Sequence, residues 1–158
     1  MKLKSIAAAV IALAASSAFA NVVNLGPLDN ASATIGRSVS GSIFSDTYNF
    51  QLTNPGSVTG LAVSLNIGSF FNISNFTAEL YSGSTLLGSI VGATPTTFSN
   101  LAAGNYALNV FGNPTGSLGG TYSGALAAVT APVPEPETYA MMIAGLVAVG
   151  FLAGRRKQ

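Results

Sequence analysis

Few side chains between residues 21 and 131 could do chemistry. The charged ones are Asp29, Arg37, Asp46 and Glu79, three acids and one base, and the whole chain has no His and no Cys. These absences remove the usual protein ligands of zinc, copper and iron. They also remove the thiol nucleophile and the commonest general base. We therefore expect no metal site, no cofactor and no enzymatic activity. The net charge of residues 21–131, with three acids and one base, is −2, which offers no electrostatic footprint for nucleic acid.

The three acids do not combine into a recognisable site. A glycosidase needs two carboxylates at a set separation, but Asp29 is expected in the turn Leu28-Asp29-Asn30. Glu79 is expected on the outward face of a strand whose inward residues are Ala78 and Leu80. A calcium site formed by Asp46 with Asp29 or Glu79 lacks the clustered oxygen ligands that hard cations require.

Asp46 is the one acid in an unusual position. Between Phe44 and Leu52 the even positions are mostly apolar and the odd positions polar, which predicts a strand with one buried face. Asp46 shares the apolar face, where an ionised carboxylate is costly unless it is paired or hydrogen-bonded. We interpret it as accepting backbone N–H groups of a neighbouring turn or pairing with Arg37. A ligand-binding role is the alternative.

Strands are expected in most of the stretch around these residues. Alternating polarity, punctuated by Gly, Pro and Asn, predicts strands near 44–52, 59–67, 76–80, 86–91, 96–99, 106–110 and 121–129. No sustained helical period occurs between residues 21 and 131. The sequence therefore predicts an all-β domain over 21–131, an antiparallel sandwich or barrel without disulfides.

The first residues have the pattern of an export signal. Lys2 and Lys4 precede an apolar run, and small residues follow it at Ala18 and Ala20. A basic start, a short apolar middle and a small-residue cleavage point are typical of a secretory signal peptide. We expect a signal peptide over 1–20, with cleavage after Ala20.

The last residues contain three different pieces in a fixed order. A proline-stiffened linker over 132–138 precedes an uncharged apolar stretch over 139–154, and a basic tail over 155–158 follows. The apolar stretch predicts a transmembrane helix, although it is short of the usual 20 residues. The tail contributes Arg155, Arg156 and Lys157, which favour the cytoplasmic side, so the rest of the chain is expected outside.

This order resembles the PEP-CTERM sorting signal of Gram-negative bacteria, with Pro134, Glu135 and Pro136 as the motif. The resemblance implies recognition by an exosortase-type membrane protease or transpeptidase, and cleavage near the motif. It also implies association with exopolysaccharide and biofilm, and a transient or permanent anchor in the inner membrane before the protein reaches the cell surface or matrix. An unprocessed single-pass anchor is the alternative.

Two finer resemblances lie in the domain. Phe44, Asp46 and Tyr48 resemble the F-x-D-x-F motif of a PEP-CTERM subgroup, with Tyr48 in place of the last Phe. The order of strands and turns from Ser42 to Val129 is similar to bacterial pre-peptidase C-terminal domains. That similarity implies a jelly-roll β-sandwich, which accompanies secreted enzymes as an accessory or binding module, and it carries little information on function.

Two classes of function stay open. The preferred one is a non-catalytic surface or extracellular-matrix protein. The other is a carbohydrate-binding module that holds extracellular polysaccharide through exposed aromatic and amide side chains, although core packing explains each aromatic equally well. Its candidate residues are Phe70, Phe71, Tyr81, Phe111, Tyr122, Asn72, Asn75, Asn109 and Asn113.

Overall fold

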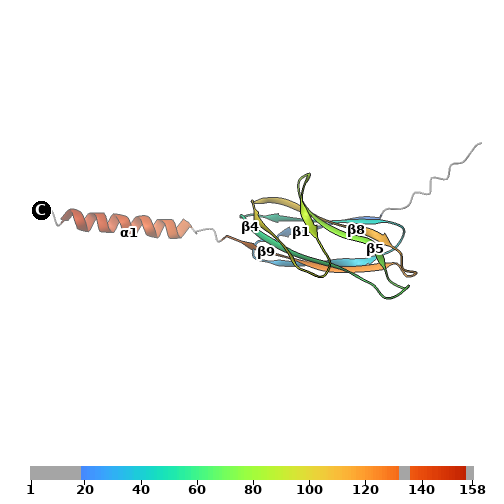
Figure 1. Ribbon diagram of the computed structural model, residues 1–158. Helices are drawn as coiled ribbons and strands as arrows, with labels where there is room; N and C mark the ends of the chain where they lie inside the picture. The colour runs from blue at the N-terminus through green and yellow to red at the C-terminus, as the bar shows by residue number, and fades with distance from the viewer. Residues whose placement is uncertain (1–18, 132–135, 156–158) are drawn as a thin grey trace, which may run out of the picture.

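The computed structural model of the protein describes residues 19–131 and 136–155, and Figure 1 shows the first range as two β-sheets packed face to face. One sheet has five strands in the order β1-β3-β8-β5-β6. Their bounds are Phe19–Pro27 (β1), Phe44–Leu52 (β3), Gly104–Pro114 (β8), Ile73–Ser82 (β5) and Thr85–Ile90 (β6).

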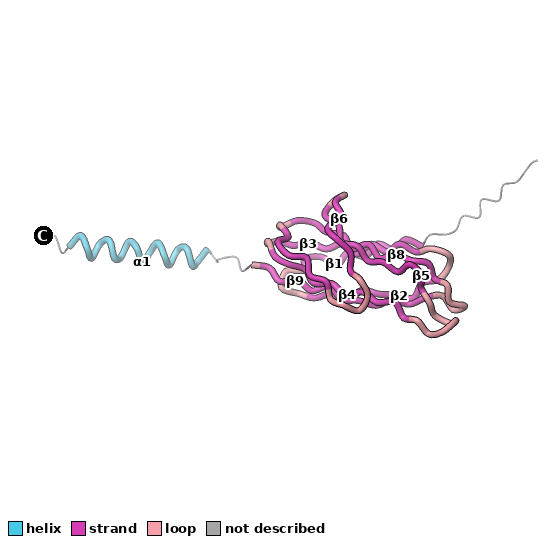
Figure 2. The backbone as a smooth tube through the Cα atoms, in the orientation of Figure 1, coloured by secondary structure: helices cyan, strands magenta, loops and turns pink. Residues whose placement is uncertain are grey.

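The second sheet has four strands in the order β2-β9-β4-β7, all of them antiparallel to their neighbours. Their bounds are Ser32–Val39 (β2), Gly120–Thr130 (β9), Gly56–Leu65 (β4) and Thr96–Leu101 (β7). Figure 2 shows that strands make up almost all of this part of the chain. The predicted all-β sandwich is confirmed.

One pair of strands departs from the antiparallel pattern. β1 runs parallel to β3, with Asn21 opposite Asp46 and Asn24 opposite Asn49. Two parallel neighbours require a crossover connection, and here β2 supplies it by crossing to the other sheet between them. The structure thus contains two strands, β1 and β2, that the sequence patterns above did not predict.

The inward faces of the strands form one apolar core. In β3 the alternation is as predicted, because Phe44, Tyr48 and Phe50 are buried together with Asp46. In β4 the inward face belongs to Val58, Gly60 and Ala62, while Leu61 and Val63 face outward and are only half-buried. A side chain at Gly60 would collide with Ile90 of the facing sheet, so the space available in the core selects the face.

A tyrosine closes the turn between β7 and β8. The Tyr106 hydroxyl donates a hydrogen bond of 2.7 Å to the carbonyl of Ala102, four residues earlier. The Tyr106 ring stacks on Phe50, with 5.6 Å between ring centroids. The same arrangement is known as a tyrosine corner in other β-sandwiches. Burial raises the pKa of Tyr106, which keeps the hydroxyl protonated as a donor.

The second described range is the helix α1, Pro136–Arg155. It begins earlier than predicted, because Pro136 and Thr138 belong to the helix and not to the linker. Pro is well suited to the first helical position, whose N–H has no partner within the helix. No helix in the described residues is long and apolar enough to cross a membrane, so the transmembrane span expected over 139–154 is not confirmed.

Candidate functional site

The three motif residues of β3 converge on a single residue of the opposite sheet. The Phe44 ring stacks on that of Tyr122 in β9, with centroids 5.4 Å apart and planes 10° from parallel. The Tyr122 hydroxyl donates to the Asp46 carboxylate and lies 2.7 Å from the Tyr48 hydroxyl. The motif is therefore one half of a contact between the sheets, and Tyr122 is the other half.

Asp46 is fully buried, and all of its hydrogen-bonding capacity is used. Arg37 in β2 binds both carboxylate oxygens, with Nε 2.7 Å from Oδ2 and Nη2 2.6 Å from Oδ1. The backbone N–H of Asn21 in β1 donates to Oδ1 at 3.1 Å, and Tyr122 donates to Oδ2. A carboxylate has about four lone-pair sites, and these four donors occupy them.

This geometry settles the interpretation of Asp46. The predicted pairing with Arg37 is confirmed, and the backbone donor comes from a strand instead of a turn. Hydrogen bonding to the Asp46 carboxylate raises the pKa of Arg37, despite the opposing effect of burial. With these four donors on its carboxylate, Asp46 joins β1, β2 and β9 across the two sheets.

The tyrosine hydroxyls form a directed chain of hydrogen bonds. The N–H of Gly36 donates to the Tyr48 hydroxyl at 3.2 Å. Since Tyr122 gives its proton to Asp46, the proton between the two hydroxyls belongs to Tyr48. Burial raises the pKa of Tyr122, and the hydrogen bond to Asp46 raises it further. The hydroxyl that distinguishes Tyr48 from the Phe of the resembling motif is thus fully used inside the protein.

A cavity of about 550 Å³ lies beside this cluster, between the edge strands β1 and β2. Arg37 stands at its wall with 29% of its side chain exposed, whereas Asp46 has none exposed. Solvent therefore meets the guanidinium and not the carboxylate, which keeps the buried acid behind its cation.

The other acids lie apart from Asp46. Asp29 caps the start of the β3–β4 turn by accepting the backbone N–H groups of Thr53 and Asn54 at 3.0 and 3.1 Å. Burial raises the pKa of Asp29, but these hydrogen bonds outweigh it and leave the pKa lowered. Glu79 is on the outward face of β5, where it accepts the Tyr81 hydroxyl at 2.7 Å. In the described residues no group of three or more acidic side chains could hold a metal ion.

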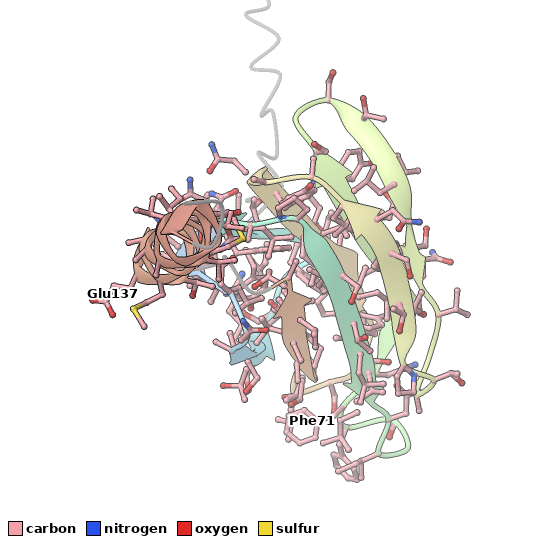
Figure 3. The ribbon with its side chains drawn as sticks, turned by 90° about the vertical axis from the view of Figure 1, so that its left-hand side faces the viewer. Phe71 and Glu137 are labelled. Carbon is pink, nitrogen blue, oxygen red and sulfur yellow. The ribbon has the colours of Figure 1, made fainter. Side chains whose placement is uncertain are left out.

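The predicted aromatic candidates for carbohydrate binding are scattered. Tyr122 is only 1% exposed, so its assignment to a sugar-binding surface is wrong; the ring is core. Phe70 is 57% exposed and lies with Phe71 in the β4–β5 connection, at one end of the sandwich (Figure 3). Tyr81 and Phe111 are half-buried on the outward face of the five-stranded sheet. The structure therefore does not bring these rings together into one platform.

The amide candidates are equally dispersed. Asn109 accepts a hydrogen bond of 3.0 Å from the Thr47 hydroxyl, so its carbonyl is already engaged. Asn75 has a φ of 54°, a left-handed conformation that Asn tolerates, which explains its presence in a strand irregularity. Asn72 directly precedes the first residue of β5, and Asn113 is the second-last residue of β8, which pairs with that end of β5.

The predicted processing sites lie mostly outside the described residues. This is so for Ala18, Pro134, Glu135, Arg156 and Lys157. Ala20 is the second residue of β1, and Pro136 and Arg155 are the first and last residues of α1. Glu137, in the first turn of α1, is labelled in Figure 3, and an acid there favours the positive end of the helix dipole.

Comparisons with known proteins identify the second range but not the sandwich. The family described as the PEP-CTERM protein-sorting motif matches residues 132–157, as the sequence resemblance predicted. The chain therefore contains this sorting motif. No curated protein matches the sequence.

Among solved structures, a periplasmic inhibitor of g-type lysozyme from Aeromonas hydrophila is 16% identical, with a TM-score of 0.47, covering 69% of this chain and 98% of that one. The corresponding Salmonella Typhimurium inhibitor is 22% identical, with a TM-score of 0.42, covering 68% and 98%. The pre-peptidase C-terminal domain of a Bacillus anthracis collagenase is 16% identical, with a TM-score of 0.40, covering 69% and 93%. Such a domain was expected from the sequence. These similarities carry no information about ligands.

Proposed function

We propose that this protein is an exported, non-catalytic component of the extracellular polysaccharide matrix, delivered by an exosortase-type enzyme acting on residues 132–157. The PEP-CTERM sorting motif carries this proposal, because the motif implies export, transit through the membrane and processing there. On this view the apolar face of α1 enters the membrane only briefly, with Arg155, Arg156 and Lys157 at the cytoplasmic side.

The three carboxylates of the sandwich support the non-catalytic part of the proposal. Asp46 is saturated by four donors, Asp29 caps a turn, and Glu79 lies on an outer face with Tyr81 as its partner. Three acids with separate structural partners cannot share a substrate between them. These roles suit a domain that is delivered to the extracellular matrix and adheres there.

The second candidate function is a carbohydrate-binding module. It is favoured by the outward face of the five-stranded sheet, where half-buried Tyr81 and Phe111 alternate with amide side chains. A pull-down on the producer's own exopolysaccharide separates the two functions. Saturable retention that a defined sugar competes away indicates a module, whereas co-fractionation without competition indicates a matrix component.

Processing at the sorting motif predicts two masses for the protein in its producer. We expect the full-length tail in the cell envelope and a species ending near Pro134 in the medium, measured by intact mass spectrometry. Changing Pro134, Glu135 and Pro136 to Ala should remove the truncated species, and Glu137→Gln, the neighbouring acid outside these three residues, should leave it. A full-length tail on all of the secreted protein would contradict the proposal.

Cleavage after Ala20 predicts a new charge beside Asp46. The Asn21 nitrogen, an amide donor 3.1 Å from Oδ1 of Asp46, would become an ammonium group. A charge-assisted hydrogen bond is about twice as strong as a neutral one. We expect the free energy of unfolding of the processed protein to be about 1 kcal/mol higher than that of the same chain with one extra Met before Asn21.

The measurement is urea unfolding of both forms at two pH values. The difference should be present at pH 7 and absent at alkaline pH, where the amine is neutral. Equal stability of both forms at pH 7, with the start at Asn21 verified by mass, would show that the ammonium does not reach Asp46.

A further inference from the structure

Four carboxamide side chains line one groove at the end of the five-stranded sheet. The groove has a volume of about 610 Å³, and Asn24, Asn49, Gln51 and Asn105 supply the side chains that can form hydrogen bonds to a ligand. The residues that line it include no acid and no base. Gly26, Pro27 and Gly83 are also among the lining residues.

The strand register places these amides as a compact patch. Asn24 of β1 lies opposite Asn49 of β3, and Gln51, two residues along β3, lies opposite Asn105 of β8. Residues two apart on a strand share a face, and neighbouring strands lie about 4.8 Å apart. The parallel pairing of β1 is what adds Asn24 to the patch.

The amides are unused by the protein. In the described part of the chain, the side chains of Asn49, Gln51 and Asn105 make no hydrogen bond to another protein group. Asn24 uses only its carbonyl oxygen, which accepts the N–H of Gly26 at 3.0 Å, so its NH₂ group stays available. Each carboxamide offers two donors, and the three free ones also offer an acceptor.

The patch rests on a rigid support. Beneath it, the buried rings of Phe50 and Tyr106 stack on each other, and the Tyr106 hydroxyl is tied to Ala102. Ala107, opposite Asn49, leaves room above the sheet, and Tyr81 lies opposite Ala107 on β5. Tyr81 is half-buried, its hydroxyl donates to Glu79, and it is not among the residues that line the groove.

From this geometry we propose that the groove is a binding site for a neutral, hydroxyl-rich polysaccharide chain. Paired hydrogen-bond donors and acceptors without charge match the vicinal hydroxyl groups of a sugar. A nucleic acid would require cations, and a protein partner would require buried apolar anchors. The lining of this groove offers neither. This proposal deepens the carbohydrate-binding function proposed above. It rests on the proposed matrix function only for the location of the polymer.

The test is affinity electrophoresis of the full chain in gels containing dextran, mixed-linkage β-glucan or the neutral fraction of the producer's exopolysaccharide, with alginate as an acidic comparison. We expect retardation by at least one neutral polymer and none by alginate. The triple variant Asn49→Ala, Gln51→Ala, Asn105→Ala should bind at least tenfold more weakly. Asn66→Ala, an exposed amide outside the groove, should bind normally.

Side-chain amide resonances provide a second readout that does not depend on electrophoresis. On addition of the retarding polymer, the NH₂ signals of Asn24, Asn49, Gln51 and Asn105 should shift, and that of Asn66 should not. No retardation in any neutral polymer, or equal retardation of the triple variant, overturns the proposal. Because purified protein is used, failure here leaves the sorting result untouched, and failure of sorting leaves this result untouched.

Discussion

Replacing Asp46 by Ala is expected to lower the free energy of unfolding by about 3–5 kcal/mol. The change leaves the Arg37 guanidinium without its bidentate partner and removes the acceptor of the Tyr122 hydroxyl. An uncompensated charge and an unsatisfied buried donor are both costly. The measurement is equilibrium unfolding in urea, with circular dichroism confirming a folded baseline.

A double-mutant cycle separates the pair from the packing around it. Arg37→Met should also destabilise, because it leaves a buried carboxylate with no cation, whereas Arg37→Met with Asp46→Leu should recover most of the loss. Asp46→Asn keeps the shape but removes the charge, and we expect an intermediate effect. An unchanged melting temperature for Asp46→Ala, accompanied by lost polysaccharide binding, would show that Asp46 serves a ligand and not the fold.

Gly36→Ala is expected to have the second large effect, a loss of about 2–6 kcal/mol. Gly36 has a φ of 141°, which side chains rarely adopt, and its Cβ would lie 2.5 Å from the Tyr122 carbonyl oxygen and 2.9 Å from the Ser123 Cα. Backbone strain and overpacking each cost about 1–3 kcal/mol. A displacement of the backbone at Gly36 would also move its N–H, which donates a hydrogen bond to the Tyr48 hydroxyl. Urea unfolding measures the loss.

Gly68→Ala provides the matched control. Gly68 has a φ of 52°, and an added Cβ would meet nothing within 4 Å. Only the left-handed conformation is then penalised, at about 1–2 kcal/mol. If both variants lost the same stability, the close approach of β2 to β9 would not be the cause.

Local patterns predicted the strands whose two faces differ clearly in polarity. β3 was predicted with its observed bounds, because Phe44, Tyr48 and Phe50 alternate with polar residues. β1 and β2 were missed. In β2 the inward residues Ile35 and Val39 are separated by Arg37, which breaks the apolar period. Only the partner of Arg37, on another strand, explains why a cation faces inward.

Which face of β4 is buried could not be predicted from the residues of β4 alone. Leu61 and Val63 lie outward because Ile90 of the facing sheet occupies the space above Gly60. Which face of a strand is buried depends on volume contributed by other strands. The same limit explains the error on Tyr122. An aromatic residue after a Gly-rich loop is as consistent with a surface as with a core until its neighbours are known.

The amide groove was also beyond local reasoning. Asn24, Asn49 and Asn105 are ordinary polar residues in the sequence, and only the parallel pairing of β1 with β3 and the register of β8 bring them together. The distance between these amides is a property of the sheet and not of the local sequence.

Composition and contiguous order were enough to predict the class of the fold, the scarcity of reactive side chains and the sorting motif over 132–157. The sequence also offered Arg37 as one of two interpretations for Asp46, because Arg37 is the one cation between residues 21 and 131, and the structure then showed the pairing. Tertiary structure alone decided that Phe44, Asp46 and Tyr48 meet Tyr122, and that four amides share one groove. Those contacts join strands far apart in the chain, and their formation depends on pairing and packing that no local pattern encodes.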